Sequence, residues 1–123
     1  MTSPDRLAAY LRHLRLDAPP EPTSEGLARV QAAHRETIGF ANFELLLGAP
    51  VRIDSEAAFD KLIARRRGGF CFEQNRLYSD MLTALDMPNR ALLARVRLGL
   101  APDDIPPRTH VLLLVELEGG LWI

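Results

Sequence analysis

Residues 65–75 read Arg65-Arg66-Arg67-Gly68-Gly69-Phe70-Cys71-Phe72-Glu73-Gln74-Asn75. Paired glycines are typical of a tight turn in which the backbone approaches a neighbouring segment closely. Apolar side chains recur at helical spacing directly after this turn and predict a helix from Cys71 to about Leu85. The single cysteine of the chain, Cys71, therefore stands at the predicted N-terminus of a helix.

Three helices are predicted before this turn. A Ser-Pro start and an apolar stripe indicate a first helix over residues 3–14. A second helix is predicted over residues 23–37, and a third begins at Asp54 or Ser55. An apolar connector, residues 40–47, is expected between the second helix and the third.

The pattern changes after residue 88. Ala91–Leu98 and His110–Leu117 read as strands, and the second is apolar enough to be buried on both faces. A proline-rich loop, residues 99–107, separates them. The segment 118–120 is typical of a hairpin turn and leads into the short apolar end at 121–123.

These elements predict an α+β chain in two parts. Residues 1–88 form a helical domain that carries the cysteine, and residues 89–123 hold a few strands. Such a small sheet leaves unpaired strand edges and an uncovered apolar face. We therefore expect the chain to be the front part of a longer protein, or a truncated form of one.

Composition limits the classes of function. The 123 residues carry a net charge of −1, which gives no basic field for nucleic-acid or anionic-membrane binding. No apolar run approaches the length of a membrane span, and no secretory signal is visible, so a cytoplasmic location is expected. One cysteine excludes an internal disulfide and a multi-cysteine zinc site.

The position of Cys71 suggests a nucleophile. The N-terminus of a helix carries partial positive charge and free N–H groups, and both stabilise a thiolate. Three neighbouring arginines act in the same direction. The alternative is that Cys71 is a small buried hydrophobic residue, which is the usual role of a free cysteine.

A cysteine nucleophile needs a base, and His110 is the best candidate of three histidines. It stands where a buried strand begins, and a helix-borne cysteine opposite a strand-borne histidine is the papain-like arrangement. His34 falls on the apolar stripe of its helix and reads as a core or edge residue, and His13 reads as solvated. His110 itself could equally be structural. No Asp or Glu is well placed to orient its imidazole.

Two other readings of these residues are weaker. Cys71, His34, His110 and Glu73 match no compact metal site in their spacing. The three arginines could bind phosphate or nucleic acid, but three charges usually form a solvated helix end.

The same residues resemble the arylamine N-acetyltransferase family. Residues 67–75 resemble its nucleophile motif, and 108–113 resemble its histidine segment. Residues 38–43 match its Ile-Pro-Phe-Glu-Asn-Leu segment in outline. Segments 93–97 and 118–122 also fit, so the resemblance covers essentially the whole chain in order.

The resemblance implies a helical domain, a β-barrel-like domain of which residues 89–123 are the opening strands, and an α/β third domain absent from this chain. It implies ping-pong acetyl transfer from acetyl-CoA to an arylamine, arylhydroxylamine or hydrazine, without a metal. Cys71 would be the nucleophile and His110 its base. Phe40 and Val96 would line the acceptor pocket, and Phe70 would neighbour the nucleophile.

Three departures from the family pattern limit this expectation. The family's third catalytic residue is an Asp just after the Trp-containing strand, and the sequence ends at Ile123, apparently just short of it. The third domain is missing as well, so the isolated chain is expected to be impaired or inactive. Ala41 stands where the family has Glu, so Arg67 must pair elsewhere, with Glu73 or Glu44.

Two alternatives remain open. One is another papain-like Cys–His acyltransferase or hydrolase. The other is a non-catalytic truncated homologue that acts by interaction, including self-association, through its open strand edge.

Overall fold

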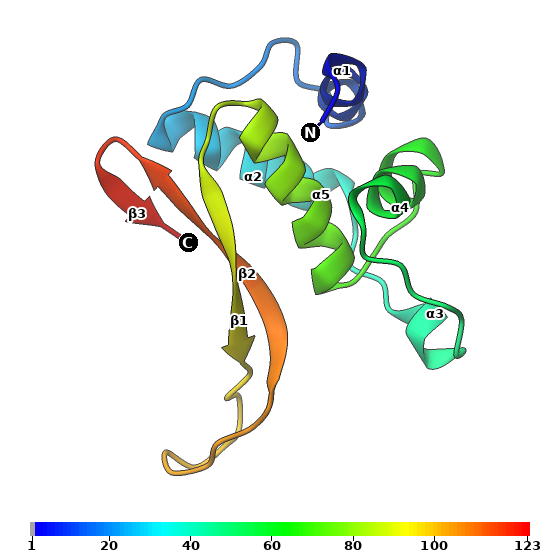
Figure 1. Ribbon diagram of the computed structural model, residues 1–123, viewed down its shortest axis with the longest axis vertical. Helices are drawn as coiled ribbons and strands as arrows, with labels where there is room; N and C mark the ends of the chain where they lie inside the picture. Colours follow the sequence, from blue (N-terminus) through cyan, green and yellow to red (C-terminus); the bar gives the residue numbers. More distant parts are fainter. Residues whose placement is uncertain (1) are drawn as a thin grey trace.

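The computed structural model describes residues 2–123 as a set of helices packed on one side of a curved sheet (Figure 1). Met1, the first residue of the predicted helical domain, lies outside the described residues. Helices precede strands along the chain, which confirms the mixed helix-and-sheet class. The elements of residues 2–123 are α1 (Pro4–His13), α2 (Ser24–Thr37), α3 (Phe43–Leu46), α4 (Ser55–Phe59), the π-helical turn η1 (Asp60–Ala64), α5 (Cys71–Ala84), β1 (Asn89–Arg95), β2 (Arg108–Leu117) and β3 (Gly120–Trp122).

Three helices begin at the residues that the sequence predicts. The side chains of Ser3, Thr23 and Asp54 each accept a hydrogen bond from the backbone N–H three residues later, at 3.3, 3.1 and 3.0 Å. N–H groups of a first helical turn have no partner within the helix, so these side chains stabilise the starts of α1, α2 and α4.

Three segments differ from the prediction. The apolar connector expected at 40–47 contains the short helix α3, because a brief apolar run does not by itself distinguish a helix from an extended segment. The first strand, expected at Ala91–Leu98, runs instead over Asn89–Arg95. Its register with β2 shifts between Ala94 and Arg95, and the pair ends with Arg95 opposite Arg108. Strand β2 was expected over His110–Leu117 and begins two residues earlier, at Arg108.

Strand β2 lies at the centre of the antiparallel sheet, which has the order β1-β2-β3 in the described part of the chain. Its pairing with β1 runs from Val115 opposite Asn89 to His110 opposite Ala94. Leu113, Leu114 and Val115 are all buried, as the prediction of a strand covered on both faces requires for this stretch. The β1–β2 hairpin extends well past the helices in Figure 1.

Helices and sheet share one hydrophobic core. Helix α5 packs against both β1 and β2, and β2 contributes apolar side chains to the cluster that α1, α2, η1 and α5 form. The packing is thus continuous across residue 88. Within residues 2–123 no helix is long and apolar enough to cross a membrane. The largest fully buried side chains are Tyr10, Val30, Leu62, Leu77, Met81, Leu82 and Met87.

The paired glycines bring two backbone segments into contact just before α5. The N–H of Gly69 donates to the carbonyl of Gly39 at 3.2 Å, and the N–H of Ala41 donates to the carbonyl of Gly69 at 3.0 Å. A Cβ on Gly68 would lie 2.7 Å from the oxygen of Gly39. A Cβ on Gly69 would lie 2.9 Å from Cδ2 of Leu62. The close approach predicted from the glycine pair is therefore confirmed.

We predict that Gly69→Ala lowers the free energy of unfolding by about 1–3 kcal/mol, because the new methyl group overpacks a filled space. Gly39→Ala is the matched control, since nothing lies within 4 Å of a Cβ built there. It should change stability by no more than about 0.5 kcal/mol. Urea denaturation of the three chains measures both effects, and equal stability of the two variants would contradict the packing argument.

Candidate active site

Cys71 is the first residue of α5, as predicted, and it is partly exposed. The first turn of a helix presents unpaired N–H groups and partial positive charge. Both favour a thiolate at this position, and the N–H groups can also stabilise an oxyanion that forms next to it.

Asn75 joins the cysteine turn to strand β2. Its Nδ2 donates to the carbonyl of Cys71 and to the carbonyl of Val111, both at 3.0 Å. Val111 directly follows His110 on β2, so one amide group fixes the beginning of α5 against the strand that carries the histidine.

Cys71 and His110 line the same cavity, which has a volume of about 480 Å³. Its walls come from α2, the segment around residue 40, α5 and β2, and they are mostly apolar with a few polar groups, as is typical of small-molecule sites. The structure thus brings the two predicted catalytic residues together. The other lining residues are Gln31, His34, Arg35, Ile38, Phe40, Gln74, Asn75 and Tyr78.

His110 is half-buried and lies opposite Ala94 in the sheet. Within residues 2–123 no carboxylate forms a hydrogen bond or ion pair with its imidazole. A histidine base needs a second group to fix its tautomer and orientation. Ile123 and His110 line a second, adjoining cavity of about 310 Å³.

His34 is buried behind the cysteine turn, which confirms its predicted core position. Gln74 uses its Nε2 to donate to the carbonyls of Gly39 at 2.8 Å and Gly69 at 3.2 Å. Its Oε1 must therefore accept from Nε2 of His34, 2.7 Å away. Nδ1 of His34 is then the acceptor for the hydroxyl of Tyr10 at 2.8 Å. The bonds define a neutral histidine that supports the turn through Gln74.

Burial acts on both partners of this pair. It lowers the pKa of His34, although the hydrogen bond that His34 donates to Gln74 opposes that effect. It raises the pKa of Tyr10 well above 10.0, so the phenol stays a donor. The hydroxyl of Tyr78, whose ring centroid lies 5.1 Å from that of His34, is buried without a hydrogen-bond partner in the described residues.

The three residues expected near the acceptor lie in different places. Phe40 lines the cavity with Cys71 and His110, and its side chain is 70% exposed. Phe70 packs against Phe72 and faces a smaller hollow beside α3. Val96 lies just beyond the end of β1 and is exposed. In residues 2–123 neither Phe70 nor Val96 lines the cavity of Cys71 and His110.

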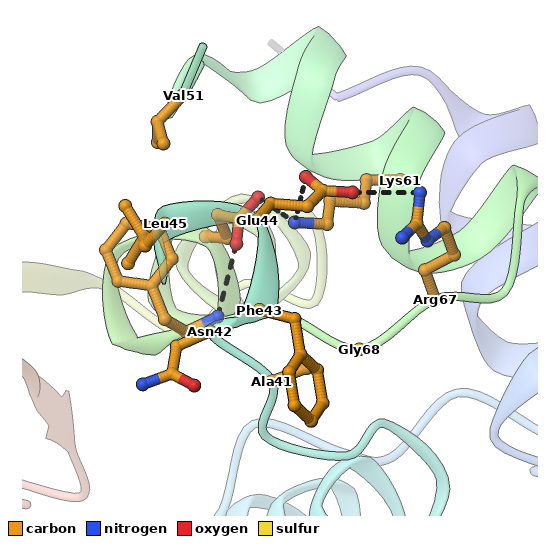
Figure 2. Close-up of a pocket in the computed structure, with 11 residues that line it drawn as sticks. Ala41, Asn42, Phe43, Glu44, Leu45, Val51, Lys61, Arg67 and Gly68 are labelled. Carbon is orange, nitrogen blue, oxygen red and sulfur yellow. Dashed lines mark hydrogen bonds and ion pairs between the residues drawn. The ribbon is translucent and has the colours of Figure 1, made fainter. Parts of the chain in front are cut away.

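Arg67 pairs with Glu44, one of the two partners expected for it, at 2.8 Å (Figure 2). In the described part of the chain, no group of three or more His, Cys, Asp or Glu side chains is arranged to hold a metal ion.

The comparisons with known proteins agree on one family. The family profile for N-acetyltransferase matches residues 23–123. An arylamine N-acetyltransferase / N-hydroxyarylamine O-acetyltransferase of Salmonella typhimurium is 41% identical over 117 residues, and an arylamine N-acetyltransferase of Mycobacterium tuberculosis is 42% identical over 116. The chain belongs to the arylamine N-acetyltransferase family.

Solved arylamine N-acetyltransferases share the fold. The structure of the Salmonella typhimurium protein matches 99% of this chain with a TM-score of 0.90 at 41% identity, and the chain covers 43% of it. The Mycobacterium marinum protein, solved in complex with CoA, matches 92% with a TM-score of 0.84 at 38% identity, and 42% of it is covered. The chain likewise spans 41% of the two curated relatives and matches 95% and 93% of its own length to them.

Sequence reasoning missed the residues that hold the site together. Asn75 and Gln74 carry the bonds that join α5 to β2 and to residue 39, and Lys61 is buried beneath the glycine turn. A signal existed for the lysine: it is the only lysine in the chain, and two apolar residues directly follow it.

We predict that acid weakens the fold through His34. The ordinary pKa of histidine is 6.5 and the folded value is lower, so the unfolded chain binds this proton first. Stability present above pH 6.5 is therefore lost as the pH falls through the folded pKa, with a slope of at most about 1.4 kcal/mol per pH unit.

Urea denaturation between pH 7 and pH 5 measures this loss, with His34→Gln as the comparison. His13, whose pKa burial also lowers, is present in both chains, so its effect is common to them. The variant should lose less stability on acidification than the native chain. Identical pH slopes would show that His34 is not the responsible group.

Proposed function

We propose that this chain is the acetyl-accepting part of an arylamine N-acetyltransferase, with Cys71 as nucleophile and His110 as base. The observation that carries the proposal is the shared cavity of these two residues at the N-terminus of α5. The relatives named for acetyl transfer and the CoA complex of the Mycobacterium marinum protein support acetyl-CoA as the donor.

The proposed reaction has two halves. His110 takes the proton of the Cys71 thiol, and the resulting thiolate attacks the carbonyl carbon of the thioester. This forms a tetrahedral oxyanion, for which the N–H groups of the first α5 turn are the available donors. Breaking the C–S bond to CoA leaves acetyl-Cys71, and the CoA thiolate takes a proton from the His110 imidazolium. An amine then attacks the acetyl carbon, His110 takes the amine proton, and the Cys71 thiolate is restored.

The acceptor proposed for the second half is an arylamine, arylhydroxylamine or hydrazine. The largely apolar walls of the cavity and the exposed ring of Phe40 suit a flat aromatic molecule. Phe70 and Val96 would join this pocket only if further residues of a longer protein closed it around them.

The group that orients His110 is proposed to lie in the portion of the relatives that this chain does not span. Ile123 already lines a cavity with His110, so a residue that follows it would have a short path to the imidazole. On this proposal β1, β2 and β3 open a barrel-like domain, and the chain alone transfers acetyl groups slowly, because an unoriented histidine costs orders of magnitude in rate.

We predict that prolonged incubation with acetyl-CoA adds one acetyl group to the chain and none to Cys71→Ala, because the thiol is the accepting atom. Intact-mass spectrometry measures the addition, and a hydrazine or arylamine added afterwards should discharge it.

An unmodified native chain that retains its native circular-dichroism spectrum, or equal labelling of Cys71→Ala, would contradict the proposal. An unmodified chain that also associates in a concentration-dependent way would favour the interaction function through the open strand edge.

A further inference from the structure

A chain of four charged side chains runs beneath the turn that precedes Cys71. Arg67 pairs with Glu44 at 2.8 Å, Glu44 pairs with Lys61 at 2.9 Å, and Lys61 pairs with Glu73 at 2.8 Å. Figure 2 shows Lys61 and Arg67 reaching the carboxylate of Glu44 from two sides. The signs alternate and the four charges sum to zero, so each inner charge contacts two opposite ones.

The end of this row of four charged side chains that Lys61 and Glu73 form is buried. Lys61 is 8% exposed and Glu73 is 5% exposed. Burial opposes the charged form of Lys61, but its hydrogen bonds to Glu73 and Glu44 outweigh that effect and raise its pKa. A buried ion pair is costly to break, because the partner that remains is left charged and unpaired.

Glu73 also holds the backbone next to the cysteine. Its Oε1 accepts the N–H of Phe70, the residue before Cys71, at 3.2 Å. A Cβ on Gly69 would lie 3.1 Å from the same oxygen, so the turn rests directly on this carboxylate. The carboxylate thus fixes the start of α5 from below.

This capping places a carboxylate within the first turn of α5, where its negative charge offsets the partial positive charge of the helix N-terminus beside Cys71. Lys61 offsets that charge at 2.8 Å from the other carboxylate oxygen. The other ionisable groups that line the cavity of Cys71 are His34 and Arg35 on α2, Tyr78 on α5 and His110 on β2. Of all these groups, Lys61 is the cation in direct contact with Glu73.

We propose that Lys61 is a positioning residue for Cys71: it lets Glu73 cap the turn while cancelling the charge that Glu73 brings to the N-terminus of α5. Lys61 touches neither the cysteine nor the cavity and acts through Glu73. Glu44 belongs to the same group of ion pairs, because it contacts Lys61, as Glu73 does, and also pairs with Arg67. The inference rests on the proposed role of Cys71 as the nucleophile.

The test uses two substitutions that break the same ion pair. Lys61→Met leaves the Glu73 charge uncompensated, so Cys71 should become less reactive. Glu73→Gln removes that charge but keeps an oxygen for the N–H of Phe70, so Cys71 should become more reactive. A residue with a merely structural role would give losses in both variants, so opposite signs identify the electrostatic role.

The measurement is the rate of Cys71 alkylation by iodoacetamide, followed by intact mass between pH 5 and pH 9. At pH 7 we expect Lys61→Met to be slower by about tenfold, the factor for about 1.4 kcal/mol, and Glu73→Gln to be faster than the native chain. The double variant Lys61→Met/Glu73→Gln should return to within about threefold of the native rate. Arg52→Met is the matched control, because Arg52 forms an exposed ion pair with Asp54 at 3.0 Å and no ion pair with Glu44, Lys61 or Glu73 in the described residues, and it should leave the rate unchanged.

Alkylation of Cys71 in Glu73→Gln that is slower than in the native chain would overturn the inference. This comparison remains informative even if Lys61→Met does not fold. A folded Lys61→Met that reacts at the native rate, or an equal loss of rate in Arg52→Met, would also overturn it. Iodoacetamide needs no acetyl-CoA, so the two proposals can fail separately. If the alkylation rates of the variants fall in the expected order but the native chain takes up no acetyl group from acetyl-CoA, the inference stands and the proposed function is refuted.

Discussion

Two stretches of backbone touch just before Cys71, and the position of the cysteine depends on that contact. The N–H of Gly69 donates to the carbonyl of Gly39, and a side chain on residue 68 would collide with that carbonyl oxygen. Gln74 then binds the carbonyls of both glycines from α5. The helix therefore begins at Cys71 because its first turn is anchored to the chain thirty residues earlier.

The remaining interactions of the site follow from where α5 begins. Asn75, one turn into the helix, reaches both the carbonyl of Cys71 and β2, so the strand that carries His110 is held across the cysteine turn. His34 supports the same helix from the opposite side through Gln74. Polar bonds thus join the cysteine turn to the strand that carries His110, and the apolar packing of α5 on the sheet adds stability to the same arrangement.

The sequence predicts what short-range rules govern. Capping residues give the starts of the helices, the glycine pair gives the close turn, and the order of a helix-borne cysteine and a strand-borne histidine gives the site. The long-range partners of polar side chains could not be predicted, because Asn75, Gln74 and Lys61 meet groups that lie between 12 and 36 residues away. The end of β1 was also missed, because it depends on where the pairing with β2 stops and not on the residues of β1 alone.

Cys71 and His110 are proposed to act as a pair across the cavity that they both line between α5 and β2. The most direct measurement is the pH dependence of Cys71 alkylation in the native chain and in His110→Gln, with circular dichroism as the control for folding. If the two residues act as a pair, Cys71 of the native chain should be alkylated readily near pH 7. In His110→Gln the alkylation rate at that pH should be lower by at least about tenfold. Superimposable pH profiles from two folded chains would show that His110 does not act on Cys71 and would contradict the proposed pairing of the two residues.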